Sequence, residues 1–95
     1  MAMVYDCNTD IPGQELVLSQ TESNLALLQL CVGGYIQELR SPDGEASLIC
    51  HEEALMMAEP VFNARASVIA SGWFGCSYPI YGPVVLVENV GDKWV

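Results

Sequence analysis

Residues 50–55, CHEEAL, bring together the side chains best suited to catalysis. A zinc-protease motif of the form H-E-x-x-H needs a second histidine at position 55, where this chain has Leu55. Cys50 and His51 have the chemistry of a nucleophile and a base, but neighbouring residues of a strand point to opposite faces of a sheet. The two glutamates that follow lack the alternating oxygen ligands of a calcium-binding loop. We therefore expect no catalytic centre, no metal and no cofactor.

A pair of glycines, Gly33 and Gly34, interrupts an apolar run in the segment LCVGGYIQEL. A phosphate-binding loop places its glycines at the start of a helix, where backbone N–H groups and the positive end of the dipole face the anion. Here the glycines follow a helical pattern, and neither G-x-G-x-x-G nor G-x-x-x-x-G-K-[ST] occurs in the chain. The pair therefore predicts the end of a helix, with one glycine as its left-handed cap.

The residues best suited to ligand binding lie between positions 63 and 81. The segment SGWFGCSYPIYGP is dense in aromatic rings, which stack on bases or anchor protein contacts, or else cap the core. Arg65 is one of only three cations and falls near the expected start of a helix. There it either pairs with a nearby carboxylate or meets an anion beside the helix N–H groups. The candidate ligand-binding residues are Asn63, Arg65, Trp73, Phe74, Tyr78 and Tyr81.

The charge balance limits the class of partner. Twelve carboxylates face three basic residues, for a formal net charge of −9. Because phosphate contacts need Lys and Arg, this charge argues against direct binding of nucleic acid and against anionic membranes. It fits a basic protein partner or mimicry of nucleic acid, or it serves only to keep an apolar chain soluble.

The remaining composition predicts a cytoplasmic protein. No apolar run reaches the 18 residues of a membrane span, and the N-terminus MAMVYDCNTD lacks the basic region of a secretion signal. Four widely spaced cysteines form no C-x-x-C pair, so we expect free thiols in a reducing compartment.

The hydrophobic pattern predicts a single domain over residues 1–95, with elements in the order ββαββαβ. The expected strands are 3–7, 15–19, 35–39, 47–51 and 84–90, and the expected helices are TESNLALLQLCV and VFNARASVIASG. The four consecutive apolar residues of VVLV indicate a buried central strand. This order favours an α+β fold, in which a mostly antiparallel sheet carries both helices packed on one face.

Local signals place the ends of these elements. Thr21 and Asn63 are expected to cap the two helices, and Gly72 is expected to stop the second. The PDG sequence at 42–44 predicts a hairpin turn, while EEALMMAEP at 52–60 is either one helical turn or a loop.

These segments together resemble a small family of domains of unknown function. The resemblance rests on a leucine-rich helix running into VGGYIQEL, a later EE turn, VFNARA and a closing YGPVVLV, from about Leu16 to Val90. The family is found largely in bacteriophages, plasmids and other mobile elements, and no enzymatic activity is general to it. HEEAL departs from the family's asparagine and glycine around the acidic turn, and the 71–83 loop is expanded. The resemblance thus implies origin more than chemistry.

We expect a non-enzymatic binding protein of a phage or other mobile element, acting against host defence in the host cytoplasm. In the first hypothesis, a homo-oligomer sequesters a small nucleotide-like immune signal in a pocket between subunits. In the second, the chain is an acidic decoy that binds a basic host defence protein or nuclease directly, with an affinity that falls steeply as ionic strength rises. A third hypothesis, a small hydrolase, has no credible nucleophile–base pair.

Overall fold

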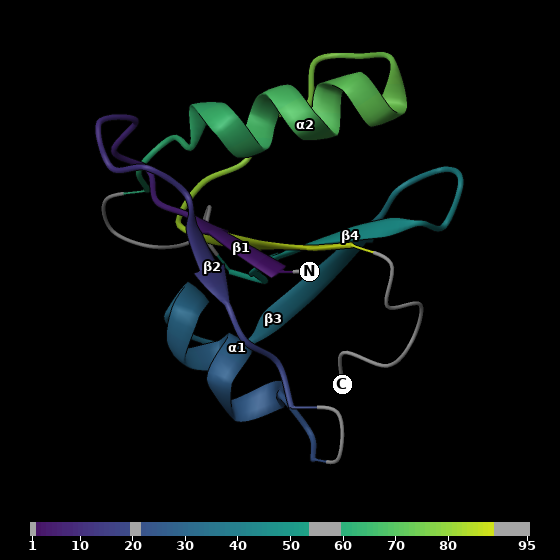
Figure 1. Ribbon diagram of the computed structural model, residues 1–95. Helices are drawn as coiled ribbons and strands as arrows, with labels where there is room; N and C mark the ends of the chain where they lie inside the picture. The colour runs from purple at the N-terminus through teal and green to yellow at the C-terminus, as the bar shows by residue number, and fades with distance from the viewer. Residues whose placement is uncertain (1, 20–21, 54–59, 89–95) are drawn as a thin grey trace.

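The computed structural model describes residues 2–19, 22–53 and 60–88 (Figure 1). Over these residues the elements follow the predicted order ββαββαβ, and the prediction of an α+β fold is confirmed. The elements are β1 (Ala2–Tyr5), β2 (Gln14–Leu16), α1 (Leu25–Val32), β3 (Ile36–Arg40), β4 (Ala46–His51), α2 (Ala64–Phe74) and β5 (Val84–Glu88). No helix of the described part of the chain is long and apolar enough to cross a membrane.

The strands form one sheet in the order β2-β1-β5-β4-β3, and each neighbouring pair is antiparallel. β5 therefore occupies the centre, and its residues Val84–Val87 are all buried. The prediction that the VVLV run is a buried central strand is confirmed. The residues at 89–90, which were also assigned to this strand, lie outside the described ranges.

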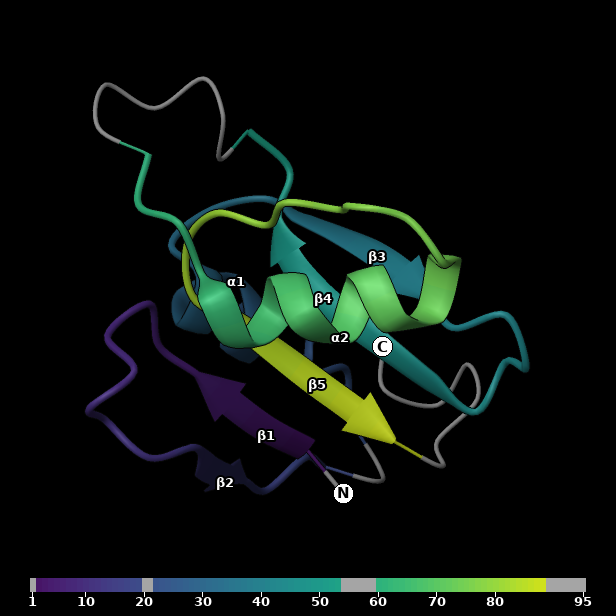
Figure 2. The same cartoon turned by 90° about the horizontal axis from the view of Figure 1, so that it is seen from above.

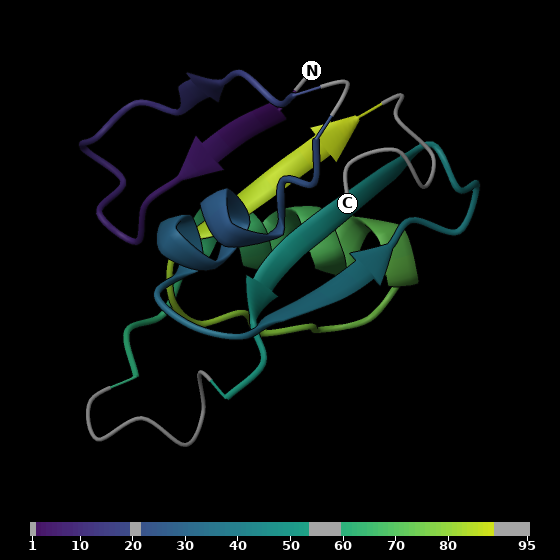
Figure 3. The same ribbon diagram turned by 90° about the horizontal axis from the view of Figure 1, so that it is seen from below.

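The two helices lie on opposite faces of the sheet, so the prediction that both pack on one face is wrong (Figures 2 and 3). Val85 of β5 belongs to a core cluster with Leu28 of α1. Its neighbour Leu86 belongs to a second cluster with Ala66 of α2. Because successive side chains of a strand alternate between faces, a run of consecutive apolar residues needs cover on both sides. The result is a helix–sheet–helix sandwich.

The glycine pair ends α1, as the sequence predicts. Gly33 adopts a left-handed conformation (φ 88°), and its N–H donates to the carbonyl of Gln29 at 2.8 Å. Gly34 serves a different purpose, because a Cβ there would collide with the ring of His51. At its other end α1 begins after Asn24, and Thr21, the expected cap, lies outside the described residues.

The predicted hairpin turn joins β3 to β4. Gly44 has the positive φ (75°) that a side chain would disfavour, and its N–H donates to the carbonyl of Ser41 at 2.9 Å. The carboxylate of Asp43 accepts from the Ser41 hydroxyl at 2.6 Å and from the N–H of Glu45 at 3.0 Å. These two hydrogen bonds lower the pKa of Asp43. Its carboxylate therefore stays ionised at pH values where an ordinary aspartate begins to be protonated.

Helix α2 runs past its predicted stop. It ends at Phe74, and the left-handed residue that closes it is Gly75 (φ 67°) rather than Gly72. Trp73 and Phe74 are therefore helical, whereas the sequence predicts that they belong to a loop over residues 71–83. A single glycine inside a helix weakens it by only about 1 kcal/mol, which packing against the sheet offsets here.

Candidate binding surface on the α2 layer

Asn63, one of the six candidate ligand-binding residues, is fully buried at the start of α2. Its Oδ1 accepts from the N–H of Ala66 at 3.1 Å, so its predicted role as the N-cap is confirmed. Its Nδ2 donates to the carbonyls of Tyr5 at 3.0 Å and Gly82 at 2.9 Å. Both donors and the acceptor of the amide are thus used within the chain, which gives Asn63 a structural role.

Arg65 holds the β1–β2 loop against the first turn of α2. One terminal nitrogen donates to the carbonyl of Ile11 at 2.6 Å, and the other to those of Asp6 at 2.7 Å and Asn8 at 3.1 Å. The guanidinium also lies 5.3 Å from the ring centroid of Tyr5, within range of a cation–π contact. Its Nε is buried without a hydrogen-bond partner among the described residues. The cation is therefore engaged by backbone carbonyls.

The four candidate aromatic residues separate into two groups. Phe74 lies between Trp73 and Tyr78, with ring centroids 6.4 Å and 5.1 Å away, at the C-terminal end of α2. Tyr81 instead meets Phe62 edge-on at 5.8 Å, beside the residues that precede the helix. The two groups lie at opposite ends of α2, which has eleven residues and is about 16 Å long. One subunit therefore does not bring the six candidate ligand-binding residues together.

Trp73 and Tyr78 also contribute to the core. Both pack against the cluster that joins α2 to the sheet, and both are half-buried. Of this aromatic group, Phe74 is the most exposed, with 38% of its surface accessible to solvent. The rings therefore cap the core at this end of the helix while presenting one edge to solvent.

The α2 layer (residues 60–83) forms a surface that contains no carboxylates and exposes apolar side chains. All twelve carboxylates of the chain lie outside residues 60–87, where Arg65 is the one charged residue. The exposed apolar side chains are Val61 (57%), Phe62 (50%), Val68 (72%) and Phe74 (38%). Sequence reasoning missed the first three of these, although the absence of Asp and Glu over 28 residues was a visible signal.

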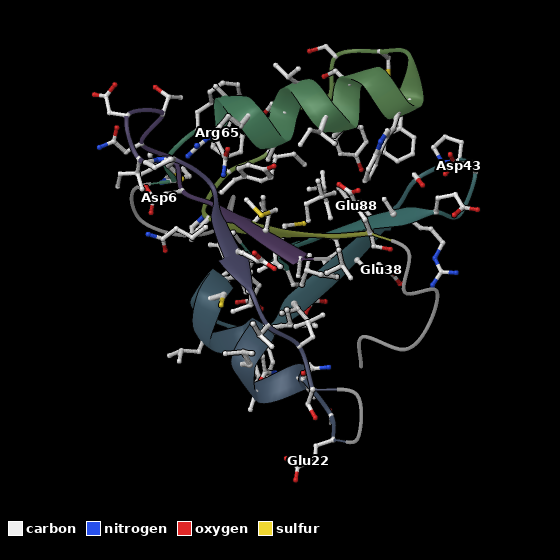
Figure 4. The ribbon with its side chains drawn as sticks, viewed as in Figure 1. Asp6, Glu22, Glu38, Asp43, Arg65 and Glu88 are labelled. Carbon is white, nitrogen blue, oxygen red and sulfur yellow. The ribbon has the colours of Figure 1, made fainter. Side chains whose placement is uncertain are left out.

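Acidic loops flank the α2 layer at both ends (Figure 4). Near the start of the helix, the loop held by Arg65 carries Asp6 and Asp10. Beyond its other end, the β3–β4 turn carries Asp43 and Glu45. An apolar centre with a charged rim is the usual anatomy of a protein–protein interface.

Cys50 and His51 lie apart, as expected for neighbours on a strand. Cys50 is buried in the core cluster on the α2 side, with its thiol 3.6 Å from the carbonyl of Gln37. The ring of His51 lies against Gly34, and its Nδ1 accepts from the N–H of Glu53 at 2.9 Å. Within the described ranges, no three His, Cys, Asp or Glu residues are grouped to hold a metal ion.

Burial raises the pKa of Cys50 to about 11, which gives a testable difference in reactivity. The thiolate is the nucleophile, and raising the pKa from 9.0 to about 11 lowers the thiolate fraction about a hundredfold near pH 8. We expect iodoacetamide at pH 8 to label the exposed Cys76 at least about a hundredfold faster than Cys50. Peptide mass spectrometry over time measures both rates. Fast labelling of Cys50 would contradict a buried, inert thiol and revive the nucleophile hypothesis.

The fold and this surface define the chain as a small α+β domain with a helix–sheet–helix core. A family model described as "Domain of unknown function (DUF3846)" matches residues 11–94. The chain therefore belongs to this family, which confirms the resemblance to a family of domains of unknown function. Comparison with curated proteins and comparison with solved structures found no match.

Proposed function

We propose that this protein is a non-enzymatic binding protein that contacts a basic partner protein through its α2 layer. The observation that carries the proposal is the exposed apolar surface, free of carboxylates, between two acidic loops. The apolar centre supplies contact area, and the carboxylates steer and orient a partner with cations around its own apolar patch. Val68, 72% exposed in the middle of α2, is the central anchor.

A small nucleotide-like ligand is the second candidate, supported by the cluster of Trp73, Phe74 and Tyr78. These rings offer a stacking surface at one end of the helix. A phosphate group also needs a cation, and the described arginines already have partners: Arg65 binds backbone carbonyls, and Arg40 pairs with Glu38 at 3.2 Å. Direct protein contact is therefore the better-supported function.

The biological setting belongs to the same proposal. The resemblance of the VGGYIQEL and YGPVVLV segments to a family of mobile elements supports an origin in a phage or plasmid. In that setting the basic partner is a host defence protein or nuclease, and binding takes place in the host cytoplasm. The net charge of −9 supports such an acidic decoy, because nucleases and other nucleic-acid-binding proteins present basic surfaces.

Site-specific photo-crosslinking in host cells tests the surface. A benzophenone side chain at position 61 should crosslink one basic protein, whereas the same group at Ala26, on the outer side of α1, should not. Adding Val68→Glu should remove the crosslink from position 61 while changing the free energy of unfolding by no more than about 0.5 kcal/mol. Raising NaCl from about 0.05 M to about 0.5 M should weaken the purified complex about tenfold or more.

Other outcomes would point elsewhere. Equal crosslinking from positions 61 and 26, or a complex that survives Val68→Glu, would contradict binding through the α2 layer. Native mass spectrometry that finds a retained small molecule, lost on Trp73→Ala, would replace protein binding with ligand sequestration.

A further inference from the structure

β3 forms one end of the sheet, and its hydrogen-bonding pattern shows which backbone groups face outward. Among the described residues, β3 pairs only with β4. The carbonyl of Tyr35 accepts from Glu52 at 2.9 Å, and the N–H of Ser41 donates to Ala46 at 2.8 Å, so odd-numbered residues face β4. Because these groups alternate along an antiparallel strand, those of Ile36, Glu38 and Arg40 point away from the sheet.

The side chains along this edge carry opposite charges two residues apart. Glu38 and Arg40 lie on the same face of the sheet, and their side chains form a salt bridge at 3.2 Å. Glu38 also accepts from the hydroxyl of Ser47 at 2.5 Å, which fixes its position on that face. Charges on an edge strand ordinarily oppose pairing with another strand. A strand that carries both signs at this spacing is complementary to a second copy of itself.

We propose that β3 pairs with β3 of a second copy, antiparallel, about a two-fold axis at Leu39. In this register Glu38 lies opposite Arg40 of the second copy, and Arg40 lies opposite Glu38 of the second copy. Both are pairs of outward-facing residues, so each pair exchanges two N–H···O bonds. The salt bridge within each chain gives way to two cross-strand pairs of opposite charge.

The charges select this register over its neighbours. Moving the axis to Glu38 places this carboxylate opposite Glu38 of the second copy, and moving it to Arg40 places the two Arg40 guanidinium groups opposite each other. Both arrangements are unfavourable because the charges have the same sign. An axis at Gln37 leaves both charges opposite uncharged residues. Pro42 ends the ladder, because it lies opposite Ile36 of the second copy and has no N–H to donate.

A second copy is a better occupant than an unrelated strand because its Glu38 and Arg40 repeat the same charge pattern and complement it in the antiparallel register. Two chains of −9 repel each other overall, so they associate only where local charges are complementary. The pairing uses the backbone edge of β3, whereas the proposed partner contact is centred on Val68 of α2. The inference is therefore independent of the proposed function, and either can fail alone.

Hydrogen exchange across a concentration series tests the pairing in the full chain. Sedimentation equilibrium should show a dimer, and the amides of Ile36, Glu38 and Arg40 should gain protection as the dimer forms. The amides of Gln37 and Leu39, which already face β4, should not change. This alternation is specific to strand pairing. A monomer at every concentration, or a dimer without new protection at the even positions, would overturn the proposal.

Charge exchange provides the second arm. Glu38→Arg and Arg40→Glu alone should each weaken the dimer about tenfold or more, because each sets like charges opposite one another. The double variant carrying both changes should restore the wild-type dissociation constant. Glu15→Arg on β2, with the same change in net charge as Glu38→Arg, is the matched control and should not weaken the dimer. If the double variant forms a dimer no tighter than those of the single variants, the proposed register is wrong.

Discussion

Replacing Asn63 with alanine is expected to lower the free energy of unfolding by about 3–7 kcal/mol. Loss of an N-cap costs about 1 kcal/mol, and each buried carbonyl left without its donor adds about 1–3 kcal/mol. The two carbonyls are those of Tyr5, at the end of β1, and Gly82, just before β5. Asn63 thus joins α2 to two neighbouring strands. For a domain whose total stability is about 5–15 kcal/mol, the change approaches complete unfolding.

Chemical unfolding followed by circular dichroism measures the change, and two variants isolate its cause. Asn8→Ala removes the same side chain from the exposed β1–β2 loop and should cost no more than about 0.5 kcal/mol. Asn63→Asp keeps the capping oxygen but loses both amide donors and buries a charge. Its deficit should shrink as the pH falls from 7 to 4, because a buried carboxyl has a raised pKa and its protonated form fits the site better. A small, pH-independent effect of both Asn63 variants would contradict the structural role.

Some of this architecture is readable from local sequence. Gly33 ends α1 because few residues other than glycine tolerate its φ of 88°, and this requirement is visible as the VGG sequence. The run Val84–Val87 predicts a central strand. Because its consecutive side chains are all apolar, it also predicts that both faces of the sheet are covered. The one-face prediction missed this second consequence. Two helices on one side would leave Val85 and Val87 facing water.

The roles of the candidate site residues were not predictable in the same way. Arg65 binds a carbonyl 54 positions earlier in the chain, and Asn63 binds one 58 positions earlier. Contacts over such separations depend on how the strands are ordered in the sheet, which no local pattern specifies. The absence of Asp and Glu over residues 60–87 was visible in the sequence. Its meaning depended on knowing that Val68 points to solvent while Ala66 and Ala70 point to the core.

Arg65→Lys is expected to cost about 2 kcal/mol of global stability, although the charge is kept. The planar guanidinium reaches three carbonyls of the β1–β2 loop at once, at 2.6 to 3.1 Å, whereas an ammonium group is a single point of charge. The amides of residues 6–13 should therefore exchange faster, while those of β4 and β5 change only with the global stability. Arg40→Lys, at a surface salt bridge, is the matched control and should cost no more than about 0.5 kcal/mol.

The same variant links the fold to the proposed binding surface. Arg65 holds the loop that carries Asp6 and Asp10, so Arg65→Lys should make the position of these two carboxylates less fixed. Charges at the rim of an interface act mainly on the association rate. The variant should therefore slow association with a basic partner more than it speeds dissociation. Surface plasmon resonance with the crosslinked partner separates the two rates. If Arg65→Lys leaves loop exchange and stability unchanged, the guanidinium is not the clamp described above. Arg65 would then return to the candidates for direct contact with a ligand.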